Sequence, residues 1–232
     1  MQRFVITDIH GYYLALLQCM ERSRFDMEKD LLICLGDTCD RGPQTCESFE
    51  ELLKIKNLLY ILGNHDLCFR EHIESQGDNP EPLWTRQGGR STLKSYPAGI
   101  PASHIKLLSE ALLYLVIDNM LFVHAGLDPN KAIESNSTHD LLWNRNLIEQ
   151  AYQGRGIGNK LTPYTKVFAG HTPTTQKNFN SLKPLIFNEF RLLDTGVIHG
   201  KHLSIMNIDT DEYFQSNLVS DLYPDWVFCS NK

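Results

Sequence analysis

Short apolar runs alternate with helix-like segments in the first third of the chain, and this alternation limits the possible folds more than any other feature. The runs FVIT (4–7), LLICL (31–35) and LLYIL (58–62) are continuous and apolar, as in strands that are covered on both faces. Between them, residues 12–23 and residues 43–56, which open with a proline, have the apolar spacing of helices. Strands joined through helices pair in parallel by right-handed crossovers, so the sequence predicts an α/β fold with a β-α-β-α-β core.

The remaining two thirds of the chain add strands and helices in a less regular order. A strand pair with a tight turn, a helix and a further strand are expected at residues 113–125, 137–152 and 166–170. Residues 66–116 read as mostly helical or irregular, with a Gly-Gly loop at 88–89, and the pattern is mainly β from residue 185 onward. Because no linker, repeat or low-complexity segment separates these parts, residues 1–232 are expected to form a single domain.

The composition is that of an ordinary globular protein with neither a nucleic-acid nor a membrane partner. Hydrophobic residues make up 42% and charged residues 22% of the 232 residues, a length that allows a substantial core. The formal net charge is −6 and there is no basic tract, which argues against nucleic acid. No run approaches the ~20 apolar residues that span a bilayer, so no membrane is expected among the partners.

The cysteines and the N-terminus indicate a cytoplasmic protein. No two of the six cysteines form a C-x-x-C pair, and Cys19 and Cys34 lie in apolar runs, where a thiol packs as a small hydrophobic group. The opening MQRFVITD lacks the long apolar core of a signal peptide. Reduced thiols in a soluble, cytoplasmic protein are therefore expected.

Five predicted strands are each followed by a glycine and a side chain that can bind a metal ion. Those side chains, at the carboxyl ends of the strands where sites form in open α/β sheets, are Asp8, His10, Asp37, Asn64, His124 and His171. They offer oxygen and imidazole donors without thiolate, which suits Mn, Fe or Zn. Six ligands are too many for one catalytic ion and suit two ions ~3.5–4 Å apart with a shared carboxylate. Asp37, from a central strand, is the expected bridge.

The other histidines are expected to be ordinary core or surface residues. They are His72, His104, His139, His199 and His202. The pair His199-Gly200 is similar to the site motifs but lacks the strand pattern before it.

The ordered motifs carry a family resemblance. They are DIHG (8–11), GDTCDRG (36–42), GNHD (63–66), HAG (124–126) and GHT (170–172). This set resembles the signature of the phosphoprotein phosphatase branch of the metallophosphoesterases, most of all the compact bacterial and phage group typified by bacteriophage lambda protein phosphatase. The similarity runs from residue 4 to about residue 208 and includes LLWNR (141–145) and LLDTGVIHGKHLSIMNID (192–209). The implied fold is a β-sandwich of mixed sheets flanked by helices.

The resemblance implies two divalent metal ions, with Mn expected first and Fe or Zn also suited to the donors. The implied ligands of the first ion are Asp8, His10 and Asp37, and those of the second are Asp37, Asn64, His124 and His171. The ions would neutralise a phosphate monoester and supply a bridging hydroxide near neutral pH. Direct attack by that hydroxide, without a phosphoenzyme, is the expected reaction.

The resemblance also implies the residues that bind the substrate and move the proton. Arg41 and Arg145 are expected to grip the phosphate, because guanidinium forks match its oxygens in a bidentate way. His65 is the expected general acid, with Asp40 holding its ring, because a neighbouring carboxylate favours the charged imidazole. His65 and Asn64 are also expected to contact the substrate.

Some residues depart from the family pattern or imitate another one. Thr7 replaces a usual glycine, Asp66 replaces a usual glutamate, and Cys39 takes a usually aliphatic position beside the metal ligands. Cys39 is expected to be a packed small side chain rather than a redox-sensitive thiol. GRGIGNK (154–160) lacks the spacing of a phosphate loop and is expected to be a surface loop.

Three functions are compatible with these residues. The leading prediction is a metal-dependent protein serine/threonine phosphatase acting on a phosphoprotein or a small phosphorylated substrate. The alternative is a hydrolase of diadenosine tetraphosphate or a similar dinucleotide, as in a sister group; Asp66 and Pro43 favour it, whereas Asp40 and the short chain disfavour it. A catalytically inactive binding module is disfavoured because the ligand set is complete.

Overall fold

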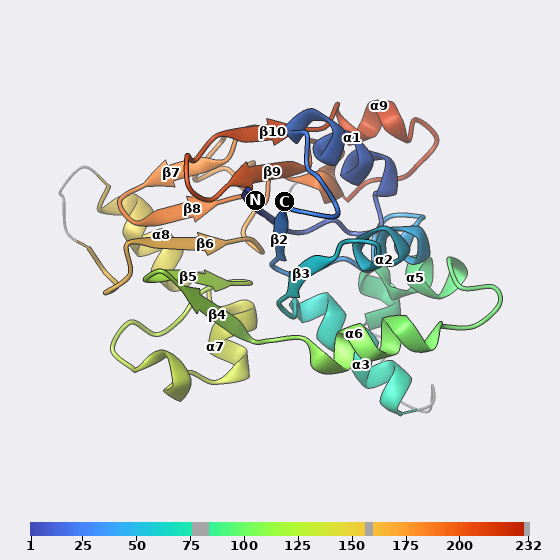
Figure 1. Ribbon diagram of the computed structural model, residues 1–232, viewed down its shortest axis with the longest axis horizontal. Helices are drawn as coiled ribbons and strands as arrows, with labels where there is room; N and C mark the ends of the chain where they lie inside the picture. The colour runs from blue at the N-terminus through green and yellow to red at the C-terminus, as the bar shows by residue number, and fades with distance from the viewer. Residues whose placement is uncertain (76–83, 156–159, 230–232) are drawn as a thin grey trace.

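Two five-stranded sheets pack face to face with helices on their outer faces, as the computed structural model of residues 1–75, 84–155 and 160–229 shows (Figure 1). The first sheet has the order β10-β9-β1-β2-β3 and the second the order β4-β5-β6-β8-β7. The strands are β1 Arg3–Ile6, β2 Leu31–Cys34, β3 Asn57–Tyr60, β4 Tyr114–Ile117, β5 Met120–Val123, β6 Lys166–Ala169, β7 Leu185–Phe187, β8 Phe190–Leu192, β9 Ser204–Asn207 and β10 Tyr213–Gln215. The predicted α/β sandwich of mixed sheets is confirmed.

The first sheet contains the predicted parallel unit. β1 pairs in parallel with β2, with Val5 opposite Ile33, and β2 pairs in parallel with β3, with Ile33 opposite Leu59. The crossovers are α1 Tyr13–Ser23 and α2 Thr45–Leu53. β9 then adds in antiparallel orientation beside β1, which makes the sheet mixed.

The second sheet is parallel at its centre and antiparallel at both edges. β5, β6 and β8 run parallel, whereas β4 pairs antiparallel with β5 and β7 antiparallel with β8. The β4–β5 turn consists of Asp118 and Asn119, with φ of 51° and 59°, the left-handed backbone that two-residue hairpins favour. The predicted tight turn is confirmed.

The hydrophobic core forms three layers. Between the sheets, Val5 and Ile33 pack with residues of the second sheet, where the rings of Phe122 and Phe168 stack 4.9 Å apart. Outside the first sheet lie α1, α2, α3 Asn64–Glu74 and α6 Ala102–Glu110, and outside the second lie α7 Thr138–Trp143 and α8 Asn146–Gln153. Each sheet is therefore covered on both faces, which explains the continuous apolar runs.

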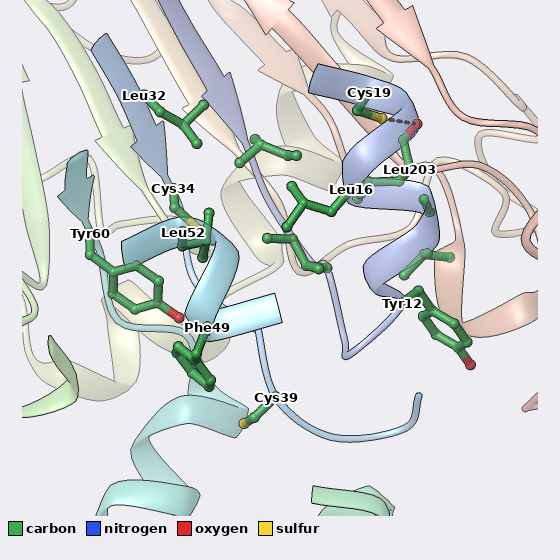
Figure 2. Packing of buried hydrophobic residues seen from close by; sticks show 14 of the residues in the cluster. Tyr12, Leu16, Cys19, Leu32, Cys34, Cys39, Phe49, Leu52, Tyr60 and Leu203 are labelled. Carbon is green, nitrogen blue, oxygen red and sulfur yellow. Dashed lines mark hydrogen bonds between the residues drawn. The ribbon is translucent and has the colours of Figure 1, made fainter. Parts of the chain in front are cut away.

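Figure 2 shows the layer between the first sheet and its helices, where thiols pack among aliphatic and aromatic groups. Cys19 and Cys34 are fully buried there, as expected, and Cys19 donates to the carbonyl of Leu203 at 3.2 Å. Cys39 is also fully buried, which agrees with a packed side chain. All six cysteines are free thiols.

The predicted start of one helix and one predicted loop were wrong. Helix α2 begins at Thr45 rather than at Pro43, because the preceding residues are tied to the first loop: the N–H of Gly42 donates to the His10 carbonyl at 2.8 Å. The expected Gly-Gly loop lies instead in a π-helical turn, Thr85–Gly89, that leads into α5 Arg90–Lys94. Gly88, with φ of 133°, allows the kink.

The predicted helix over 137–152 is two helices with a break between them. Asn144 lies in this break, and its Oδ1 accepts the N–H of Asn146, the first residue of the second helix, at 2.9 Å. Gly126 lies so close that a Cβ there would be 2.6 Å from the Asn144 carbonyl oxygen. The break turns Arg145 toward the cleft described below.

The last described part of the chain is a short helix, α9 Val219–Leu222, followed by a turn and irregular backbone to residue 229. Single helical turns lie at Ile133–Ser135 and Val197–His199. Among the helices of the described residues, none combines the length and apolar character needed to cross a membrane. Most of the predicted loop GRGIGNK, residues 156–159, lies outside the described residues.

Candidate active site

A cleft of about 1070 Å³ opens at the carboxyl ends of the parallel strands. The predicted site residues that line it are Asp8, His10, Asp37, Arg41, Asn64, His65, Arg145 and His171. His124 and Asp40 are fully buried behind them. The structure therefore brings all ten predicted site residues together.

The loops that carry these residues have unusual backbone conformations. Asp8, His10, Asp37, Arg41 and His171 have φ between 49° and 71°, in the left-handed region that side chains disfavour. Each such residue costs about 1–3 kcal/mol, and such strain is concentrated at functional sites. These residues lie in three of the loops that surround the cleft, those after β1, β2 and β6.

The glycines of the motifs allow the loops to contact one another. Gly36 has φ of 90°, and a Cβ there would lie 2.2 Å from the backbone nitrogen of Gly63. A Cβ on Gly63 would lie 2.1 Å from Oδ1 of Asp37, and one on Gly170 would lie 2.2 Å from Oδ2 of Asp8. Any larger residue would push the predicted ligands apart.

Asp37 occupies the centre of the cluster. Its Oδ2 lies 3.6 Å from Nε2 of His10 and 3.5 Å from Nε2 of His124. It belongs to two groups whose donor atoms all lie within 4.8 Å of one another, one with His10 and His65 and one with His124 and His171. This double membership is the geometry that a bridging carboxylate requires.

The neighbouring donors face the same space. Oδ1 of Asn64 lies 3.0 Å from Nε2 of His124 and 2.9 Å from Nδ1 of His171. Oδ1 of Asp8 lies 3.8 Å from Nε2 of His10. The other oxygen of Asp8 accepts the hydroxyl of Thr7 at 2.6 Å. Thr7, which departs from the family pattern, thus orients a predicted ligand.

Backbone carbonyls fix the orientation of two imidazoles. Nδ1 of His10 lies 2.9 Å from the carbonyl of Cys39, and Nδ1 of His124 lies 2.8 Å from that of Leu35. An N–H at each Nδ1 leaves Nε2 as the free donor, as is usual for metal-binding histidines.

Burial dominates the electrostatics of the cluster. It raises the pKa of Asp8 to about 6 and lowers the pKa of His10 to about 4 and that of His171 to about 2. Burial also disfavours charge on Asp37 and His124, but their mutual attraction holds the pKa of Asp37 well below its usual value and raises that of His124 to about 9. Negative charge is thus favoured on Asp37, whereas burial disfavours it on Asp8.

The donor set fits divalent cations. Asp8 and Asp37 are buried, and within the described residues neither forms an ion pair with a lysine or arginine. Buried carboxylates of this kind are stabilised by metal ions, and oxygen with imidazole suits Mn, Fe or Zn. The residues can therefore hold two ions that share Asp37.

His65 is held by a buried carboxylate. Oδ2 of Asp40 lies 2.7 Å from Nδ1 of His65 and accepts the indole N–H of Trp84 at 2.8 Å. Its Oδ1 accepts the hydroxyl of Thr92 at 2.7 Å. Burial opposes charge on His65, but the carboxylates of Asp37 and Asp40 raise its pKa. No motif pointed to Trp84 or Thr92, which lie more than 40 residues from Asp40 in the chain.

Asp66 supports the central loop from behind. Its carboxylate accepts the backbone N–H groups of Asp37 at 2.7 Å, Thr38 at 3.1 Å and Gly63 at 3.2 Å, and the hydroxyl of Tyr60 at 2.8 Å. It is fully buried. This departure from the family pattern therefore acts on the loop that carries Asp37.

The two predicted phosphate-binding arginines have no carboxylate partner among the described residues. Nη2 of Arg145 donates to the carbonyl of His171 at 3.1 Å. Nη1 of Arg41 donates to Sγ of Cys229 at 3.4 Å, and the indole of Trp226 donates to the Arg41 carbonyl at 3.1 Å. The C-terminal tail thus lies beside Arg41 and leaves both guanidinium groups available to an anion.

Asp194 and His199 are among the lining residues that were not predicted. Asp194 is buried in the wall of the cleft, and burial together with the charge of Asp8 raises its pKa well above the usual value. It follows strand β8 and precedes Thr195-Gly196, the same signal that identified the other loops. His199, expected to be outside the site, also lines the cleft, and its Nδ1 lies 3.0 Å from the Cys229 carbonyl.

Known proteins are similar to this chain in sequence or in fold. Serine/threonine-protein phosphatase 1 of Salmonella typhimurium is 24% identical over 213 residues, which cover 88% of this chain and 91% of that protein. A symmetrical bis(5'-nucleosyl)-tetraphosphatase of Coxiella burnetii is 29% identical over 136 residues, 59% of this chain and 45% of that protein. A solved structure assigned as a diadenosine tetraphosphatase superposes with a TM-score of 0.68 at 18% identity, covering 92% of both chains.

The family is shown by a match along almost the whole chain. The model of the calcineurin-like phosphoesterases matches residues 1–225, which include every motif described above. Members of that family use divalent metal ions, in agreement with the donor set around Asp37. The chain therefore belongs to the calcineurin-like phosphoesterases.

Proposed function

We propose that this phosphoesterase is a metal-dependent phosphomonoester hydrolase that acts on phosphoserine and phosphothreonine in proteins. The observation that carries the proposal is the position of Asp37, shared by two donor groups in a cleft that also presents Arg41 and Arg145. Two divalent ions, Mn in the first place and Fe or Zn otherwise, would neutralise the phosphate and supply a hydroxide nucleophile near neutral pH.

The side chains of the cleft divide the remaining tasks. Arg41 and Arg145 bind the phosphate oxygens, because neither guanidinium is neutralised by a carboxylate of the described residues. His65 gives a proton from Nε2 to the leaving alkoxide, while Asp40 holds Nδ1 at 2.7 Å. Trp84 keeps Asp40 in place, so the acid has a fixed direction.

Several observations favour a phosphoprotein over a dinucleotide. The Salmonella relative that shares nearly its full length with this chain is named a serine/threonine phosphatase, whereas the match to the tetraphosphatase covers under half of that protein. Asp66, one of the two residues that favoured a dinucleotide, is buried behind the loops. Pro43, the other, does not line the cleft.

A dinucleoside polyphosphate is the second candidate substrate. Trp143 lines the cleft and presents an indole ring on which a base can stack. The structural similarity to a protein assigned as a diadenosine tetraphosphatase agrees with this alternative.

Location, partners and domain count stay predictions. A cytoplasmic location is supported by six free thiols, and the net charge of −6 supports a lack of nucleic-acid binding. A single domain is supported by the cleft, which takes residues from both sheets.

Initial rates on matched substrates test the proposal. Protein stripped with a chelator and reloaded with Mn would be given an aryl phosphate, phosphoserine, phosphothreonine and phosphotyrosine peptides, and diadenosine tetraphosphate. We expect metal-dependent hydrolysis, with phosphoserine and phosphothreonine peptides turned over faster than the dinucleotide. Faster hydrolysis of the dinucleotide would contradict the proposed phosphoprotein substrate. If metal-loaded protein hydrolysed none of the substrates, the proposal that it is an enzyme would be wrong.

A further inference from the structure

A second group of metal-binding side chains lies away from the cleft, between two helices on the outer face of the first sheet. Cys46 and Glu50 are four residues apart on α2, so they share one face of the helix, and His104 reaches them from α6. One donor atom from each residue lies within 4.8 Å of the other two. We propose that these three residues bind a zinc ion, separate from the ions of the cleft.

The arrangement of His104 is that of a metal ligand with a supporting partner. Its side chain is fully buried, with Nε2 3.0 Å from Oε1 of Glu50 and Nδ1 2.9 Å from the hydroxyl of Tyr96. The Tyr96 hydroxyl oxygen can accept a hydrogen bond from an N–H at Nδ1, and in that tautomer the lone pair of Nε2 is available to an ion.

The other two donors are not used elsewhere in the described residues. Sγ of Cys46 makes no hydrogen bond there; the hydrogen bond to Oγ of Ser95, at 3.2 Å, is donated by the backbone N–H of Cys46. Glu50 forms an ion pair with His104 and with no lysine or arginine of the described chain. Negative charge from the adjacent Glu47 also acts on Cys46. The charge of Lys54 also acts on Glu50, but the Lys54 ammonium is bound to Glu51, with Nζ 2.7 Å from Oε2.

The donor types select the metal. One thiolate, one imidazole and one carboxylate form a mixed set that zinc accepts in tetrahedral geometry, with water as the fourth ligand. Mn and Mg prefer oxygen-rich sets, which this site lacks. Glu50 has a side chain that is 52% exposed, so an ion can enter from solvent. On binding, the Cys46 thiol would release its proton to water and coordinate as thiolate.

Cobalt gives a spectroscopic test that the cleft cannot imitate, because the predicted ligands of the cleft include no thiolate. Co²⁺ would be added to protein whose cleft is already loaded with Mn, and then displaced with Zn²⁺. We expect a near-ultraviolet sulfur-to-cobalt charge-transfer band that saturates at one cobalt per chain and disappears with one zinc.

Variants locate the site. Cys46→Ser should abolish the band while the Mn-dependent phosphatase activity and the circular dichroism spectrum are unchanged. Tyr96→Phe should weaken cobalt binding by about tenfold, because it removes the partner of the ligating imidazole. Cys229→Ser is the matched control, since it removes a partly buried thiol at the cleft and should keep the band. No band in the wild type, a band that survives in Cys46→Ser, or one lost in Cys229→Ser would overturn the proposal.

Discussion

Charged side chains have different partners at the two ends of the sandwich. At the amino ends of the parallel strands, Asp211 pairs with Lys166 at 2.8 Å and with Arg191 at 2.7 Å. Arg3 pairs with Asp118 at 2.6 Å and also with Asp209. Because Arg3 and Asp118 come from different sheets, as do Asp211 and its two partners, these pairs close this end of the sandwich within the chain itself.

At the carboxyl ends, charges are left without such partners. Asp8 and Asp37 face imidazoles, and Arg41 and Arg145 face the cleft without a carboxylate of the described residues. The first end stabilises the fold, and the second holds charge ready for metal ions and phosphate. Changes at one end should therefore alter stability, and changes at the other should alter function.

The largest effect is expected from Asp37→Asn. The amide removes the charge that two donor groups share, so turnover should fall on the order of 10³-fold or more and bound metal should be lost. Metal content and initial rates measure this. Asp118→Asn, the same change at the opposite end, should keep metal and turnover, and metal retained at the wild-type level in Asp37→Asn would exclude Asp37 as the bridge.

A smaller effect on function is expected from His65→Asn. Loss of the general acid should lower kcat by about 10²–10⁴-fold while the metal ions stay bound, because His65 is assigned to the proton and not to the metals. Elemental analysis beside steady-state rates separates the two roles. Loss of the ions in this variant would assign His65 to metal binding instead.

At the amino end, Asp211→Asn should change stability and leave kcat unaltered. It breaks two charge-assisted contacts between the sheets, so the free energy of unfolding should fall by about 1–3 kcal/mol in a urea titration. Asp26→Asn, at an exposed pair with Lys29, is the control and should show no measurable change. Equal stability of Asp211→Asn and wild type would show that the ion pairs of Asp211 do not stabilise this end of the sandwich.

The smallest expected effect is the pH dependence of the difference in unfolding free energy between wild type and Asp211→Asn. Burial opposes charge on Asp211, but hydrogen bonds from Arg191 and Lys166 hold its pKa below 3.8. A lowered pKa in the folded state gives stability that is present above the unfolded pKa and is lost as pH falls through the folded one. The difference in unfolding free energy between wild type and Asp211→Asn should be constant from about pH 5 to 7 and should become smaller below about pH 4. A difference that becomes larger in acid would contradict a lowered pKa of Asp211 in the folded state.

The sequence could predict the parts of the molecule that local pattern determines. Apolar runs located the core strands, and glycine with a polar residue after each run located the site loops. The break at Asn144 was not predictable in this way, because it depends on Gly126 packing against a carbonyl from another loop. The delayed start of α2 and the support of Asp40 by Trp84 also depend on contacts between distant segments. Such contacts leave no periodic signal in the chain.

The count of metal ions held by the wild-type protein tests the central claim most directly. Chelator-treated protein would be titrated with Mn and the bound metal measured by calorimetry and elemental analysis, beside Asp37→Asn. A shared carboxylate predicts two ions per wild-type chain in the cleft and the loss of both in the variant. One ion in the wild type, or one ion still bound in Asp37→Asn, would contradict a centre built around Asp37.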